Sequence, residues 1–395
     1  MNCITPPKYV ISILKRLESH GYSAYMGGGC VRDIIMNHRP NDWDICTSAL
    51  PEEVMALFPH SRPTGLKHGT VTVIEKGSAV EVTTFRAEGE YRDHRRPESV
   101  RFIADLMGDL ERRDFTVNAI ALPLSGVLFD PFNGRSDIEK KLIRCVGDPC
   151  RRFEEDALRM FRAFRFSAVL GFAIESETLS AIKEKSHLAG MLAKERICSE
   201  IEKILLSDCP DTLSDVIENG LLDGIVLRNG TVDLTTLKRL PVNRAQRWAG
   251  LCVLLLRNGM IEDAEEFLLS LRLDSATVHN SSAGCRLAAE GIPRDKASFK
   301  KLLSRNGTDI GRCAAAAAES LYGAGYIRLL RSIMKSGECY SLKRLAVSGD
   351  DLLELGFRGE KLGKELYILL DHVINFPEDN KKELLLDIAR NDKTF

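Results

Sequence analysis

Apolar residues recur at two different spacings in the first part of the chain. Residues 8–20 repeat them every three or four positions and are followed by Gly21, which predicts an amphipathic helix. Residues 51–58 begin with proline and two acids, a pattern typical of a helix start. Residues 69–75 and 78–85 instead alternate or run β-branched, so they predict two strands of a hairpin.

Helical spacing dominates the rest of the chain. Residues 151–172 carry an apolar stripe, residues 187–206 form a second amphipathic segment, and the same spacing returns at 213–222, 247–256, 262–271 and 304–322. Ten of the fourteen prolines lie in the first 150 residues, and proline is excluded from helix interiors. The predicted fold is therefore an α+β N-terminal head, with a small mixed sheet flanked by helices, followed by an all-α remainder.

Composition narrows the class of protein. The 395 residues are 44% hydrophobic, enough for several domains with sizeable cores. The net charge of −1 means that any nucleic-acid surface must be a local patch. The eleven cysteines lack zinc-finger spacing, and no signal peptide or bilayer-length apolar run is seen. We expect a cytoplasmic protein with reduced thiols, no membrane partner and no obligate protein partner.

An acidic pair in residues 27–48 is the first candidate for chemistry. Asp42 and Asp44 are two positions apart and precede an apolar stretch. In a strand, such residues project from the same face. Two carboxylates side by side suit Mg²⁺, which binds carboxylate and phosphate oxygens and keeps several waters. An Asp-x-Asp pair alone is more often a solvated loop, so the interpretation depends on its neighbours.

Three consecutive glycines stand shortly before the acidic pair. Gly28 and Gly29 have no side chains, so a phosphate can approach their amides closely. Arg32, or a helix starting at Val31, would add positive charge. A glycine run alone is usually a turn, and this one completes neither a dinucleotide fingerprint nor a P-loop. Together, the glycines and the acids favour a metal–triphosphate site.

The same stretch resembles a known superfamily. GGCVRD followed by DWDICTSALPEEV is similar to the opening motif of class II CCA-adding enzymes (tRNA nucleotidyltransferases) and bacterial poly(A) polymerases, in the nucleotidyltransferase superfamily of DNA polymerase beta. The resemblance implies addition of C, C and A to the 3′ end of tRNA from CTP and ATP, with release of diphosphate. It also implies that Asp42 and Asp44 are catalytic and hold Mg²⁺.

Further motifs extend the resemblance through the head. TTFRAEGEYRDHRRPESV (83–100) resembles the flexible loop of CCA-adding and A-adding enzymes, whereas the charge-rich composition of residues 86–113 alone indicates a solvated loop. RRDFTVNAIAL (112–122) resembles the next motif, which implies that Arg113 binds triphosphate and Asp114 the sugar or the chain geometry. Residues alone predict a helix start capped by Asp114. Glu81 is a possible third acid or an outward charge on its strand, and 127–148 resembles the third motif, with a helix from Ser136.

The segment EDALRMFRAFRF (155–166) resembles the nucleotide-selecting helix of the family. The resemblance implies that Asp156 and Arg159 bind the incoming base: aspartate accepts from the amino group of cytosine or adenine, and arginine donates to a ring nitrogen. Guanine and uracil lack that order of donor and acceptor. Glu155 would hold Arg159, while Arg162 and Arg165 would steady this layer or face phosphates. Spacing alone also fits a solvated helix with an ordinary Glu155–Arg159 pair.

Two later segments complete the resemblance. KERICSEIEKIL (194–205) resembles the fifth motif, where Glu195 and Arg196 are expected to be structural. Residues 342–366 resemble the tail of class II enzymes, with an Asp-capped helix from Gly349 and another opened by Gly359 and Gly363. There, Arg358, Lys361 and Lys364 would bind tRNA phosphates. Two capped helices with solvated basic side chains are the alternative.

We predict a catalytic head (1–140), a neck with the base-selecting helices (141–206), a helical body (207–275) and a tRNA-binding tail (276–395). Three other functions stay open from the sequence. An A-adding enzyme working beside a separate CC-adding enzyme would share the loop. A poly(A) polymerase would share the head, but it typically has DPVR rather than EDALR and a basic tail. A non-catalytic RNA-binding relative would be expected to have lost one of the paired acids, and both are present.

Overall fold

The computed structural model describes residues 4–88, 100–323 and 325–392, which divide into two compact units. The first contains residues 1–204 and 215–224, and the second contains 205–214 and 225–395. Within the described ranges, no helix has both the length and the apolar character needed to cross a membrane.

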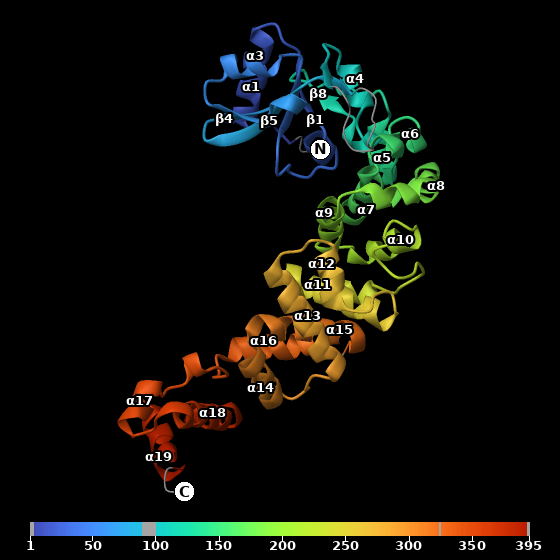
Figure 1. Cartoon of the computed structure of the whole chain (residues 1–395). Coiled ribbons are helices and arrows are strands. Elements are labelled where there is room, and N and C mark those ends of the chain that lie inside the picture. The colour runs from blue at the N-terminus through green and yellow to red at the C-terminus, as the bar shows by residue number, and fades with distance from the viewer. Residues whose placement is uncertain (1–3, 89–99, 324, 393–395) are drawn as a thin grey trace. The chain divides into compact units, whose positions relative to one another are not determined.

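A six-stranded mixed sheet forms the core of the first unit (Figure 1). Its strands lie in the order β3-β4-β5-β2-β1-β8, and only β2 and β5 pair in parallel. Helices α1 (Lys8–Ser19) and α3 (Pro51–Leu57) pack against it. The strands are β1 (Ala24–Gly27), β2 (Asp44–Thr47), β3 (Ser61–Gly65), β4 (Thr70–Glu75), β5 (Ser78–Thr84) and β8 (Ala121–Leu122). The predicted α+β head and the predicted hairpin are confirmed.

The charge-rich stretch that follows β5 contains more regular structure than its composition suggests. β6 (Arg86–Glu88) pairs with β7 (Val100–Phe102), and α4 (Leu106–Glu111) is capped by the Asp105 side chain. Asp109 and Leu110 of α4 are fully buried, so a solvated loop is wrong for this stretch. Residues 89–99 of the predicted flexible loop lie outside the described residues.

Asp114 does not begin a helix. α4 ends before it, and a single 3₁₀ turn (Thr116–Asn118) follows. Helix α2 (Gly29–Ile35) starts two residues before the predicted Val31, and α5 (Gly134–Lys140) starts two residues before Ser136. Gly134 packs closely there, because a Cβ atom at this position would lie 2.1 Å from the carbonyl oxygen of Thr116.

The single helix expected over 151–172 is wrong. The structure has two helices, α6 (Pro149–Glu155) and α7 (Leu158–Leu170). Asp156 has extended backbone angles (φ −141°, ψ 103°), and its Oδ1 accepts a hydrogen bond from the amide of Leu158 at 3.1 Å. The aspartate therefore ends one helix and satisfies a free amide of the next, which is the usual preference of aspartate.

The rest of the first unit is mostly helical. β9 (Leu142–Ile143) pairs in parallel with β10 (Ala173–Ile174), and α8 (Ser176–Lys185) follows. The helix expected over 187–206 begins as a 3₁₀ segment, Ser186–Met191, and continues as α9 (Lys194–Leu205). Helix α10 (Leu213–Glu218) follows α9 in the sequence.

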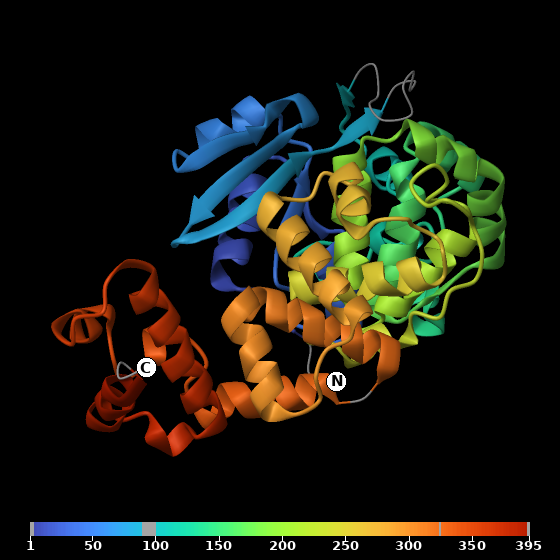
Figure 2. The same ribbon diagram turned by 60° about the horizontal axis from the view of Figure 1, so that its bottom comes forward.

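The second unit is all-helical in its described part, as predicted (Figure 2). Its core is formed by α11, α13 and α15, where Gly284 lets α13 approach α15 at Cys313. The segment 304–322 is two helices, because Gly307 (φ +84°) separates them. The helices are α11 (Arg244–Arg257), α12 (Ala264–Ser270), α13 (Ser275–Glu290), α14 (Lys296–Asn306), α15 (Thr308–Tyr322), α16 (Tyr326–Ser336), α17 (Gly349–Glu354), α18 (Gly359–Asn375) and α19 (Lys382–Asp392). Helix α17 starts at Gly349 as predicted, but Ser348 caps it, with Asp351 completing a capping box.

Candidate active site

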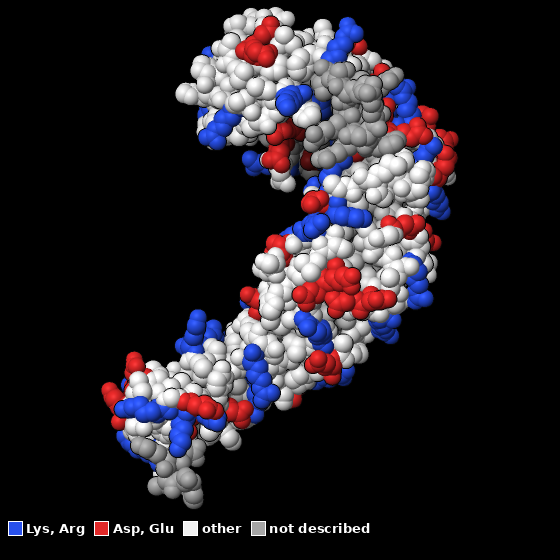
Figure 3. Space-filling view, in the orientation of Figure 1, with Lys and Arg blue, Asp and Glu red and all other residues white. Residues whose placement is uncertain are grey.

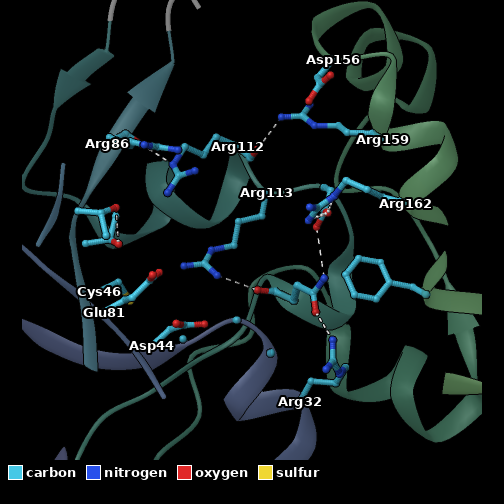
Figure 4. Close-up of a pocket in the computed structure, with 18 of the residues that line it drawn as sticks. Arg32, Asp44, Cys46, Glu81, Arg86, Arg112, Arg113, Asp156, Arg159 and Arg162 are labelled. Atoms are coloured by element: carbon cyan, nitrogen blue, oxygen red, sulfur yellow. Dashed lines mark hydrogen bonds and ion pairs between the residues drawn. The ribbon is translucent and has the colours of Figure 1, made fainter. Parts of the chain in front are cut away.

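A cavity of about 680 Å³ lies within the first unit and is lined by both the sheet and the helices of residues 149–205 (Figure 4). It brings together most of the residues singled out in the sequence: Gly28, Gly29, Arg32, Asp44, Glu81, Arg113, Asp114, Asp156, Arg159, Arg162 and Arg165. Asp42 and Glu155 are not part of the lining. Residues as far apart along the chain as Gly28 and Arg165 thus share one cavity, as a single substrate site requires.

Acidic residues occupy the sheet side of the cavity. Asp44 on β2 is directly opposite Glu81 on β5 in the parallel register, and their side chains lie together in Figure 4. Burial raises the pKa of Asp44, repulsion from Glu81 and Asp42 raises it further, and Arg113 offsets part of that effect. Asp42 is exposed, in the bend before β2. The negative charges of Glu81 and Asp42 therefore both act on Asp44.

This acidic group fits a magnesium ion with an incomplete protein shell. No three His, Cys, Asp or Glu side chains within the described ranges form a cluster able to hold a metal on their own. Mg²⁺ usually binds through one or two carboxylates and completes its shell with water and substrate phosphates. A divalent cation beside Asp44 would also relieve the repulsion that raises its pKa. Asp42 and Asp44, with Glu81 near, are the oxygen donors available for it.

Arg113 lies against the glycine turn. Gly28 has a φ of +70°, and a Cβ atom on it would lie 2.8 Å from Nη1 of Arg113. Only a residue without a side chain allows this approach. Arg113 donates to the carbonyl oxygen of Asn118 at 3.2 Å and to Asp109 at 3.1 Å. A guanidinium has about five N–H donors, so these two bonds leave others for an anionic ligand.

Arg32 and Asp114 are held in a polar network around Asn118. Arg32 donates to the side-chain oxygen of Asn118 at 2.9 Å and pairs with Asp33 at 2.8 Å. Asp114 accepts from Arg162 Nε at 2.7 Å and from the Asn118 amide at 3.3 Å. Burial alone would raise the pKa of Asp114, but Arg162 outweighs it and holds the pKa at about 2. Asp114 is therefore an ionised acceptor at neutral pH.

Arg159 is buried and bonded to Glu155 and to two main-chain carbonyl oxygens. It pairs with Glu155 at 2.6 Å and donates to the carbonyl oxygens of Arg152 at 3.2 Å and Arg112 at 3.1 Å. The Glu155–Arg159 pair is thus more than a surface i,i+4 pair, because the arginine is only 7% exposed. Glu155 holds Arg159 as the sequence suggested.

Asp156 faces the cavity from the break between α6 and α7. Arg196 on α9 forms an ion pair with it, with Nη2 at 3.0 Å from Oδ2 and Nη1 at 3.3 Å from Oδ1. Arg196 also lines the cavity. The motif around Arg196 predicts a structural residue, and its ion pair with Asp156 also places it at the cavity.

A group of three guanidinium groups surrounds Phe166. Arg165 lies 4.1 Å from the ring centroid, and Arg32 and Arg162 each lie 5.6 Å from it. Arg165 also pairs with Glu200 on α9 at 2.6 Å. Sequence reasoning missed Phe166, Asn118 and Arg196. Each stands inside a recognised motif, but only the fold shows which side chains of those motifs face the cavity.

The three basic residues proposed for the tail lie at the start of α18, in the second unit. Lys364 pairs with Glu360 at 2.7 Å, and Arg358 donates to the carbonyl oxygen of Phe357 at 2.8 Å. Blue and red side chains alternate over the C-terminal helices in Figure 3. Binding of tRNA by Arg358, Lys361 and Lys364 stays a prediction.

The chain is similar to known proteins along nearly its whole length. The family model described as the poly A polymerase head domain matches residues 24–144. The model described as a probable RNA and SrmB-binding site of polymerase A matches residues 171–227. The first unit therefore has the head of the poly(A)-polymerase class of nucleotidyltransferases.

Full-length relatives are more specific. The CCA-adding enzyme of Geobacillus sp. (strain WCH70) is 39% identical over 96% of this chain and 95% of that protein. The CCA-adding enzyme of Geobacillus stearothermophilus is 38% identical, with the same coverage. The crystal structure of the Bacillus stearothermophilus CCA-adding enzyme in complex with CTP has 33% identity and a TM-score of 0.79, covering 99% of this chain and 100% of that one. The chain belongs to the CCA-adding enzyme family.

A more distant structure shares the fold alone. The Thermotoga maritima CCA-adding enzyme complexed with tRNA has 19% identity and a TM-score of 0.66, covering 99% of this chain and 97% of that one. The resemblance stated from the sequence motifs is confirmed by these relatives.

Proposed function

We propose that this protein is a CCA-adding enzyme, which joins C, C and A in turn to the 3′ end of tRNA from CTP and ATP. One observation carries the proposal: a single cavity contains the acidic pair Asp44 and Glu81 and, opposite, the base-binding candidates Asp156 and Arg159. One nucleotide could contact both groups, as nucleotidyl transfer with base selection requires. The full-length similarity to CCA-adding enzymes supports the same activity.

In the proposed reaction, the tRNA 3′-oxygen forms a bond to the α-phosphorus of the nucleotide. The bond from that phosphorus to the diphosphate oxygen breaks, diphosphate leaves with the electron pair, and the hydroxyl proton passes to solvent. Asp42 and Asp44 would hold Mg²⁺, which supplies charge neutralisation and a more acidic 3′-hydroxyl when bound. Arg113, adjacent to the glycine turn, would bind the triphosphate. These residues act by positioning and charge.

Base selection would come from two side chains with fixed partners. Asp156 accepts a hydrogen bond from the exocyclic amine of cytosine or adenine, and Arg159 donates to the ring nitrogen beside it. Glu155 and the two carbonyl acceptors restrict the guanidinium of Arg159. Asp114 would orient the sugar or the chain end, and Arg162 and Arg165 would steady the layer around them. No nucleic-acid template is needed for this selection.

Localisation is part of the proposal. The ten cysteines in the described part of the chain are free thiols, which suits a reducing compartment. tRNA and the two nucleoside triphosphates would be met in the cytoplasm, where we place the reaction.

The test incubates purified protein and Mg²⁺ with tRNA that ends before CCA and, separately, with tRNA that already ends in CC, supplying CTP alone, ATP alone, or both. A CCA-adding enzyme gives a CC-extended product with CTP and a CCA-extended product with both. An A-adding enzyme would extend only tRNA that already ends in CC, and a poly(A) polymerase would add a run of A from ATP alone. No extension under any condition would indicate a non-catalytic RNA-binding protein and overturn the proposal.

A further inference from the structure

Asp109 is a buried carboxylate that the mechanism above does not use. It lies on α4, has an exposed fraction of 0%, and is not part of the cavity lining. Burying a charge is costly unless it is paired and hydrogen-bonded. The partners of Asp109 therefore show what the buried charge does.

Both oxygens of Asp109 contact the arginines of the RRD motif. Oδ1 accepts from Arg112 Nε at 3.1 Å and Nη2 at 2.7 Å, and Oδ2 accepts from Arg113 Nη2 at 3.1 Å. Oδ1 also accepts from the backbone amide of Arg86 at 3.4 Å. Burial would raise the pKa of Asp109, but Arg112 and Arg113 outweigh burial and lower it. The carboxylate is ionised at neutral pH and joins α4 to two arginines and to strand β6.

The contact with Arg113 fixes a side chain that reaches the cavity. Asp109 and the Asn118 carbonyl oxygen bind the guanidinium, and the glycine turn lies against the same group. Arg113 is also close enough to Asp44 to lower its pKa. Asp109 and the carbonyl oxygen of Asn118 thus hold this cation close to Asp44.

The contact with Arg112 leads to the base-selecting side of the cavity. Arg112 Nε donates to the carbonyl oxygen of Arg86 at 3.1 Å, and the Arg112 carbonyl oxygen accepts from Arg159 Nη2 at 3.1 Å. Figure 4 shows this line of contacts running from Arg86 through Arg112 to Arg159. A shift of Arg112 would therefore move an acceptor that orients Arg159.

We propose that Asp109 is a positioning residue that sets Arg113 for nucleotidyl transfer and Arg159 for base selection at the same time. The inference rests on the proposed function and deepens it, because it assigns one buried charge to both properties of the site. Asp109 is fully buried and outside the cavity lining, so it would act through the two arginines.

A purely structural ion pair is the competing explanation, since removal of one partner from any buried pair destabilises a protein. The chain offers a matched control in Asp137. This aspartate is also buried (4% exposed) on a helix of the same unit, and it pairs with Arg144 at 3.2 Å outside the cavity lining. Asp109→Asn and Asp137→Asn both replace a buried charged acceptor by its neutral isostere, but only the first contacts Arg112 and Arg113.

The experiment measures CTP and ATP addition to tRNA by the wild type and the two variants, with melting temperatures to confirm that all three are folded at the assay temperature. For Asp109→Asn we expect kcat to fall by about tenfold to a hundredfold, as for misplaced reacting groups. KM for the nucleotides should change by less than about threefold, because ground-state binding is kept. The preference for CTP over UTP should fall at least severalfold. Asp137→Asn should keep kcat and this preference while losing thermal stability.

If Asp109→Asn and Asp137→Asn differ in neither kcat nor base preference, the carboxylate is only structural and the inference is wrong. A fall in kcat with unchanged base preference would likewise overturn it, because Arg159 would then be independent of Asp109. A wild type that adds no nucleotide would instead overturn the proposed function, and this inference with it.

Discussion

Arg196 on α9 forms a two-point ion pair with Asp156 at the break between α6 and α7, although the two residues are 40 positions apart. At this break the amide of Asp156 still donates to the carbonyl oxygen of Arg152, but its φ and ψ angles are extended and not helical. The ion pair from α9 therefore supplies the orientation that a continuous helix would have given. Base selection then depends on α9 as well as on the nucleotide-selecting segment.

Replacing Arg196 should weaken base selection. In Arg196→Gln the carboxylate of Asp156 loses its charged partner and can rotate, so we expect discrimination against UTP and GTP to fall by about tenfold, as for loss of an orienting contact. Single-nucleotide incorporation on tRNA measures it. Arg135→Gln is the control, because Arg135 pairs with Glu139 on an exposed surface (60% and 63% exposed). Equal selectivity of the two variants would contradict the role of Arg196.

Direct removal of the base-binding pair gives a second prediction. Asp156→Ala or Arg159→Ala should reduce C and A selection more than tRNA affinity, since neither residue is expected to contact the body of the tRNA. Each lost base hydrogen bond should change discrimination by about 1–3 kcal/mol. Competition assays with all four triphosphates, together with tRNA binding by filter retention, separate the two effects. Unchanged selectivity would count against both residues.

Asp42, in the bend before β2, and Asp44, on β2, should be needed for every addition. Asp42→Ala and Asp44→Ala should lower transfer of both C and A by at least about a thousandfold while leaving tRNA binding intact. Because repulsion and burial raise the pKa of Asp44, its ionised form is unfavourable in the folded protein. Asp44→Asn should therefore raise the melting temperature in the absence of divalent cations. Retained transfer in either alanine variant would refute the metal-binding role.

The pH dependence of activity should also reflect the raised pKa of Asp44. A raised pKa means that Asp44 takes up its proton at a higher pH than an ordinary aspartate as the solution is acidified, and a protonated carboxyl cannot hold a cation. Glu81→Gln removes one source of repulsion, so the acidic limb of the kcat/KM profile should move to lower pH. The profile is measured well below KM, where it reports the free enzyme. A shift to higher pH would contradict the placement of Glu81 beside Asp44.

Asp114 should stabilise the head in a pH-dependent way. Its pKa of about 2 in the folded protein lies below the value of about 3.9 in the unfolded chain. The contribution of Asp114 to the free energy of unfolding is therefore complete at a pH above the unfolded pKa, and it is lost as the pH falls toward 2. Asp114→Asn should lower the free energy of unfolding by about 1–2 kcal/mol at pH 7. Urea unfolding at neutral and at strongly acidic pH measures the difference, which should shrink in acid. A difference independent of pH would mean that the Asp114 charge is not responsible.

Sequence patterns predicted the elements whose signals are local. The β4–β5 hairpin follows from alternation around Lys76 and Gly77, both of which have positive φ. The head and the helical remainder follow from proline placement and apolar spacing. The break at Asp156 could not be predicted in this way, because Ala157, Leu158 and Phe161 continue the apolar spacing across it.

The sequence predicted those cavity residues whose role the motif resemblance implies. It missed the residues that only the tertiary fold places at the cavity. Asp44, Arg113 and Arg159 stand in three motifs and line one cavity. Arg196 and Phe166 also stand in motifs, but nothing in the spacing shows that they face the cavity. Asp109 lies in a charge-rich stretch, and its burial depends on packing of α4 beside β6, which is a long-range contact.

The hydrogen bond from Arg159 to the main chain of Arg112 limits how such enzymes can be recombined. The acceptor belongs to the backbone, so its place depends on the path of the whole 109–114 segment and not on one side chain. A chimaera that takes residues 141–206 from a relative of different nucleotide preference would gain that relative's guanidinium at position 159. It would not gain the relative's backbone around position 112, where the accepting carbonyl oxygen lies. To transfer the preference, an exchange would have to carry the two segments together.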